Sequence, residues 1–166
     1  MLAMSRDGSQ LPHPEIPCKA VGMPSWRDTT SESAQDDLDN LLRIVMPLAE
    51  QTLASHGEMY PFGARISNDG EVGILGAETG LGDNPPSQQV LVGLYAGAHQ
   101  ESESLRAVAF VADVNANGGD AVRVELEHRE GTALTVLVPY TRSRFTKKLT
   151  TGQMSVSLGQ SRVFTA

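Results

Sequence analysis

The residues best suited to chemistry lie in a turn between two predicted strands. Asp113, Asn115 and Asn117 alternate there and a glycine follows, which is the spacing of the first ligands in a helix-flanked calcium loop. Position 12 of such a loop needs a bidentate glutamate but holds Val124, and Glu125 points to the opposite face of the strand. Asn, Asp and Gly also favour hairpin turns. We therefore expect a hairpin, with Asp113, Asn115 and Asn117 as the candidate ligands for a weakly bound calcium ion.

Other motifs lack a partner that their chemistry requires. The glycine-rich run 73–82 has no Gly-Lys-Ser/Thr ending for phosphate binding. His56 and Glu58 form the His-x-Glu pair of zinc deaminases, but those enzymes need two cysteines downstream and the single Cys18 lies upstream. No Gly-x-Ser-x-Gly motif is present. We expect no cofactor and no catalytic group, and we favour a protein that is not an enzyme.

Two groups of side chains are candidate binding sites. A ligand pocket between the first helix and the sheet would be lined by aromatic and imidazole side chains, namely Tyr60, Phe62, His128 and Tyr140. An anion-binding segment would use the basic residues around one phenylalanine, namely Arg142, Arg144, Lys147 and Lys148. Cations that flank an aromatic ring are suited to phosphate or nucleic acid.

Composition and charge narrow the class of protein. With 166 residues, 40% hydrophobic content and one cysteine, the chain predicts one globular domain without an internal disulfide, as expected in the reducing cytoplasm. Residues 1–130 hold 8 basic and 20 acidic residues (−12), whereas residues 131–166 hold 5 basic and none acidic (+5), which together give −7. The overall charge argues against nucleic acid and membranes as partners. The basic end would contact either an anionic partner or the acidic body of this same protein.

The chain divides into an N-terminal extension and one domain. Residues 1–30 are rich in proline and we expect them to be disordered, with the functional chain starting near Met23. The domain then covers residues 31–166. Its first helix is predicted over 31–56, with Ser31 near the start and Gly57 as the stop, and Pro47 predicts a kink or break near 43–47.

The remaining pattern alternates between strands and one more helix. The sequence predicts strands over 58–66 and 71–77 that form a hairpin, and a helix is predicted over 87–103. Three strands lie between 105 and 140, the first apolar on both faces, and a last short strand is expected within 154–164. This is an α+β two-layer domain in which helix, hairpin and helix precede a three- to four-strand antiparallel meander. The order αββαβββ resembles profilin-like and roadblock-like modules, and a cone-shaped α+β barrel is an alternative.

These features predict a protein that acts by binding. Our first hypothesis is a non-catalytic protein–protein interaction or regulatory module that works with a protein partner or as a homodimer. A small-ligand-binding protein or enzyme with the pocket described above is the second hypothesis. Contact with an anion or nucleic acid through residues 142–148 is the third.

Overall fold

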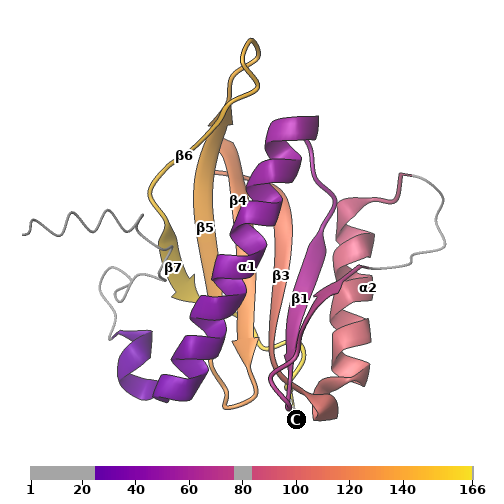
Figure 1. Ribbon diagram of the computed structural model, residues 1–166, viewed down its shortest axis with the longest axis vertical. Helices are drawn as coiled ribbons and strands as arrows, with labels where there is room; N and C mark the ends of the chain where they lie inside the picture. Colours follow the sequence, from indigo (N-terminus) through magenta and orange to yellow (C-terminus); the bar gives the residue numbers. More distant parts are fainter. Residues whose placement is uncertain (1–24, 77–83, 166) are drawn as a thin grey trace, which may run out of the picture.

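A computed structural model of the chain describes residues 25–76 and 84–165 (Figure 1). Cys18 and the expected start near Met23 lie outside the described residues. A short 3-10 helix, Trp26–Thr29, precedes the first long helix, and its Trp26 is buried in the core. Trp26 therefore contributes to the core from a position before residue 31.

The first long helix, α1, runs from Glu32 to His56 and has the predicted ends. The Ser31 hydroxyl accepts a hydrogen bond from the Ala34 amide (3.1 Å), and Gly57 ends the helix in the left-handed conformation, at φ 76°. The predicted break near Pro47 is wrong, because the helix is continuous through this residue. Pro47 lies on the exposed side, while its neighbours Val45, Met46 and Ala49 are buried and hold both halves of the helix against one sheet face.

All strands within the described ranges belong to one antiparallel sheet. They are β1 (Phe62–Ser67), β2 (Val72–Leu75), β3 (Leu105–Ala116), β4 (Gly119–His128), β5 (Ala133–Arg142), β6 (Leu149–Thr151) and β7 (Ser155–Leu158). The order is β2-β1-β3-β4-β5-β6, and β7 also pairs with β5, beside its N-terminal half. The predicted three- to four-strand meander was too small. The β1–β2 hairpin joins it because β1 pairs with β3, which gives a seven-stranded sheet.

The two helices lie on opposite faces of the sheet, so the predicted two-layer arrangement is wrong. Figure 1 shows α1 crossing the front of the sheet, where it packs on alternate β3 residues such as Ala109. The second helix, α2 (Ser87–Gln100), packs on the intervening residues, such as Phe110. A 3-10 turn, Ser102–Ser104, connects α2 to β3. Both apolar faces of β3 are thus covered, one by α1 and the other by α2. Neither helix has the length and apolar composition needed to cross a membrane, and the same holds throughout the described ranges.

The C-terminal segment completes the α2 side of the sheet. Val163 is fully buried against α2 and β3, and the carboxylate of Glu127 on β4 accepts hydrogen bonds from three successive backbone amides of residues 162–164. The predicted strand within 154–164 is therefore correct only in its first half. Its second half leaves the sheet edge and crosses the polar face of β4.

A compact polar cluster joins α2 to this segment. The Tyr95 ring meets Phe110 edge-on, with centroids 4.8 Å apart, and its hydroxyl donates to Glu125. The guanidinium of Arg162 lies over the Tyr95 ring at 4.5 Å and donates to Glu125 (3.1 Å). Burial, followed by the hydrogen bond to Glu125, raises the pKa of Tyr95 to about 12.

Replacing Tyr95 by phenylalanine is expected to lower the free energy of unfolding by about 1–2 kcal/mol at pH 8, because a charged acceptor loses its donor. The pKa of Tyr95 is higher in the folded state than in the unfolded state. The Tyr95 hydroxyl therefore makes its full contribution to the free energy of unfolding below about pH 10, and this contribution is lost as pH rises towards 12. Urea unfolding at pH 8 and pH 11 should thus show the gap between wild type and Tyr95→Phe closing. A gap of equal size at both values would contradict this account, and Tyr60→Phe, whose hydroxyl is exposed, is the control.

Candidate binding site at one end of the sheet

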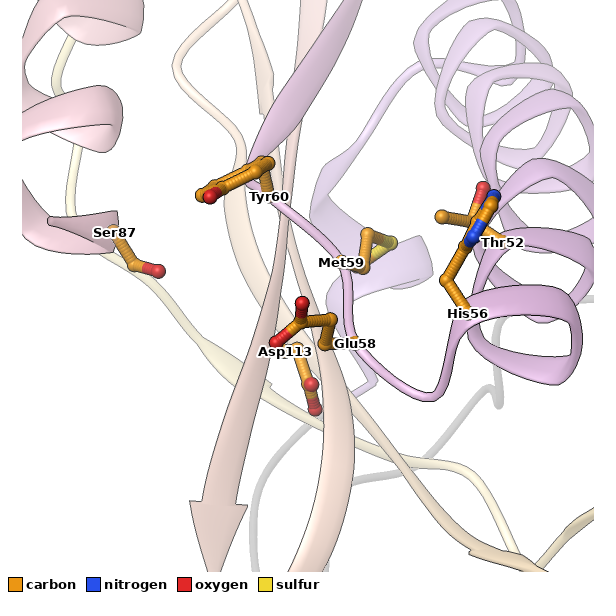
Figure 2. Close-up of a pocket in the computed structure, with 7 residues that line it drawn as sticks. All are labelled: Thr52, His56, Glu58, Met59, Tyr60, Ser87 and Asp113. Carbon is orange, nitrogen blue, oxygen red and sulfur yellow. The ribbon is translucent and has the colours of Figure 1, made fainter. Parts of the chain in front are cut away.

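A pocket of about 460 Å³ lies between the C-terminal end of α1 and the start of α2 (Figure 2). We call it the end pocket. Its lining combines two carboxylates, an imidazole, two hydroxyls and two large side chains from four parts of the chain. These residues are Thr52, His56, Glu58, Met59, Tyr60, Ser87 and Asp113.

The turn after α1 positions most of this lining. Gly57 adopts a positive φ that other residues rarely accept, and the chain then crosses the pocket as Glu58, Met59 and Tyr60 before entering β1. Met59 is buried, whereas Tyr60 is exposed and donates its hydroxyl to the Asn84 side chain (2.6 Å), just before α2. Tyr60 therefore connects the two helix ends that frame the pocket.

The electrostatics of the end pocket are negative. The half-buried Asp113 carboxylate accepts a hydrogen bond from the Tyr140 hydroxyl (2.6 Å). Burial raises the pKa of Asp113, the Tyr140 bond lowers it, and the charges of Asp120 and Glu58 raise it further. Within the described ranges, none of these three carboxylates takes part in an ion pair. The pocket therefore favours a cationic ligand.

The structure separates the four predicted pocket residues. Tyr60 lines the end pocket, and Tyr140 lies behind it through its bond to Asp113. Phe62 packs against the core on the α1 side. His128 lies near the other end of α1, where its Nε2 bonds to Asp37, nineteen residues before His56 and thus about 28 Å away along the helix.

The sequence had drawn attention to three of the pocket residues for different chemistry. His56 and Glu58 stood out as a zinc motif, and Asp113 stood out as a calcium ligand. What brings them together is the β1 entry segment running beside the end of β3, which no local spacing reveals. Thr52, Met59 and Ser87 carried no sequence signal for a site.

The turn 113–120 is a hairpin. Ala116 pairs with Gly119, and Asn117 and Gly118 form a two-residue turn with φ values of 54° and 78°. Asp113 and Asn115 are both part of the extended strand β3, and Asp113 bonds to Tyr140. Among the described residues, no three His, Cys, Asp or Glu side chains are grouped so as to hold a metal ion.

The basic segment divides into a structural and an exposed part. Arg142 is half-buried and donates from Nε and a terminal nitrogen to the Ala54 carbonyl (3.2 and 3.1 Å), at the negative end of the α1 dipole. Arg144, Lys147 and Lys148 are exposed, and none forms an ion pair with another described residue. The structure thus sets Arg142 apart from the other three predicted anion-binding residues.

The loop between β5 and β6, residues 143–148, projects beyond the end of α1 (Figure 1). We call it the hairpin tip. Its shape is fixed by bonds between Ser143 and Lys148 (2.9 Å) and from the Lys147 amide to the Ser143 carbonyl (3.0 Å). Lys147 has a φ of 56°, an uncommon value for a residue other than glycine. Phe145 is 97% exposed at this tip.

A smaller exposed apolar surface lies at the edge of the sheet that is opposite to β6. Val72 and Ile74 are exposed on β2, which is the last strand of the sheet on this side among the described residues. Ile74 is 55% exposed, which is far less than Phe145.

Comparison of the chain with protein-family models, with curated proteins and with solved structures found no match.

Proposed function

We propose that the protein is a protein–protein interaction module that binds its partner through the hairpin tip. The observation that carries this proposal is Phe145, which is 97% exposed between basic residues on a loop whose shape its own hydrogen bonds fix. Full exposure of a phenyl ring in water is costly, and its burial on binding would recover about 2 kcal/mol. A loop that is already ordered loses little conformational entropy when it docks.

Site-specific crosslinking tests the proposal. Benzoylphenylalanine at position 145, in the full chain expressed in its native host, is expected to give a discrete crosslinked species upon irradiation. The same group at Val92, an exposed residue of α2, is the matched control and should give none. Crosslinking that is equal at both positions, or absent at position 145, would overturn the proposal. Retention on heparin that Arg144→Ala with Lys147→Ala abolishes would assign the tip to anions instead.

A second candidate function is the binding of a small ligand in the end pocket. It is favoured by the volume of about 460 Å³ and by carboxylate, imidazole and phenol groups around one space. The negative lining predicts cationic aromatic ligands. Ligand-observed NMR with a fragment library is expected to detect binding of aromatic amines, and this binding should be lost in Tyr60→Ala. Fragments that bind equally to both proteins would argue against this site.

A further inference from the structure

The hairpin tip and the end pocket have complementary properties. The tip presents one phenyl ring with Arg144 and Lys147 beside it, and none of residues 131–166 is acidic. The end pocket presents Met59 and Tyr60 with the carboxylates of Glu58 and Asp113. Neither the basic residues of the tip nor the carboxylates of the pocket form an ion pair with a described residue. The tip therefore carries uncompensated positive charge and the pocket carries uncompensated negative charge, so the two surfaces attract each other.

The sizes of the two surfaces also agree. A cavity of about 150 Å³ is sufficient to hold benzene. The end pocket, at about 460 Å³, has room for a phenyl ring together with the aliphatic part of a neighbouring cationic side chain. Figure 2 shows His56 and Thr52 on one side of this space and Tyr60 on another, so that a ring entering it would meet an aromatic neighbour.

Both surfaces lie at the same end of the molecule. Arg142, at the base of the hairpin, donates to the Ala54 carbonyl, two residues before the pocket residue His56. A two-fold axis near this end would therefore bring each tip to the pocket of the other copy. Such an interface is closed and self-complementary, because every contact occurs twice.

We infer that the partner of the hairpin tip is a second copy of this chain, with Phe145 of each copy inserted into the end pocket of the other. This inference rests on the proposed function and names its partner. Arg144 and Lys147 then face Glu58 and Asp113 of the second copy. The basic C-terminal part of the chain thus meets the acidic body of another copy.

Sedimentation equilibrium of the full chain is the first test. We expect a dimer whose dissociation constant rises at least tenfold in Phe145→Ala, as for a central aromatic contact, and also rises with salt. Ile74→Ala is the matched control and should leave the constant unchanged. Circular dichroism confirms that each variant is folded. A monomer at all concentrations, or a dimer weakened by Ile74→Ala and not by Phe145→Ala, would overturn the inference.

Mixing two variants tests the reciprocal geometry. Glu58→Arg adds repulsion to the pocket without changing the tip, and we expect it to weaken the dimer as Phe145→Ala does. An equimolar mixture should associate more strongly than either variant alone. One contact of the mixed dimer has an intact tip and an intact pocket, and the two defects share the other contact, where their losses do not add in full. A mixture no stronger than its components would contradict the paired contacts.

Crosslinking at position 145 separates this inference from the proposed function. A product with twice the mass of the chain supports both. A product that contains a different protein overturns the homodimer and leaves the interaction module standing. The absence of any product overturns both.

Discussion

Replacing Glu127 by alanine is expected to lower the free energy of unfolding by about 3–5 kcal/mol and to release the C-terminal segment from the sheet. The Glu127 side chain is only 4% exposed. It accepts hydrogen bonds from the amides of Arg162 (2.9 Å), Val163 (3.0 Å) and Phe164 (2.9 Å), and from the Ser161 hydroxyl. One carboxylate therefore satisfies three consecutive backbone donors.

The loss is large because two effects are combined. Without the carboxylate, three backbone amides lose a charged acceptor in an environment that water scarcely reaches. The segment that holds the fully buried Val163 against α2 and β3 is then less firmly bound to the sheet, because the Val163 amide has lost its acceptor. Glu127→Gln keeps the size of the side chain but only one acceptor oxygen, so a smaller loss is expected.

Urea unfolding measures the loss, and hydrogen exchange locates it. In Glu127→Ala, the amides of residues 162–164 should lose their protection from exchange. The amides of α1 should stay protected, because they exchange only when the whole protein unfolds. A chain that ends at Gly159 provides the control, because Glu127→Ala should cost little once the amides are gone. If the substitution is as costly in the shortened chain as in the full one, the carboxylate does not act through this segment.

Elements with a strong local pattern were predictable from sequence. The long helix has a capping serine, a terminating glycine and apolar residues every three to four positions, and these fix its limits regardless of the rest of the chain. The β3–β4 hairpin was predictable because Asn117 and Gly118 accept positive φ values. The apolar run 107–112 was long enough to require cover on both faces, which α1 and α2 provide.

What the sequence could not show are the contacts made by polar residues far apart in the chain. Glu127 follows the alternation of a solvent-facing position, and nothing near it indicates that residues 162–164 will cover it. The end pocket likewise depends on β1 pairing with β3. Asp36 and Asp37 look equivalent as adjacent acids near the start of α1, yet only Asp37 is buried.

Asp37 connects the start of α1 to two strands, and its replacement by alanine should destabilise the fold by about 3–5 kcal/mol. Its carboxylate accepts two hydrogen bonds from Arg106 on β3 (2.7 and 2.9 Å) and one from Nε2 of His128 on β4 (3.0 Å). Nδ1 of His128 accepts from the Glu130 amide, so the bond to Asp37 must use the proton on Nε2. Asp37 is 7% exposed and His128 4%, so water does not replace the acceptor that the His128 imidazole loses.

Chemical unfolding of Asp37→Ala and Asp36→Ala gives a matched comparison, because the two acids are adjacent and only one is buried. Asp36→Ala is expected to change the free energy of unfolding by less than about 0.5 kcal/mol. In a double-mutant cycle with Arg106→Ala, the two losses should not add, because each substitution removes the same ion pair. Equal effects at positions 36 and 37, or additive losses with Arg106→Ala, would show that Asp37 does not stabilise the fold through its ion pair with Arg106.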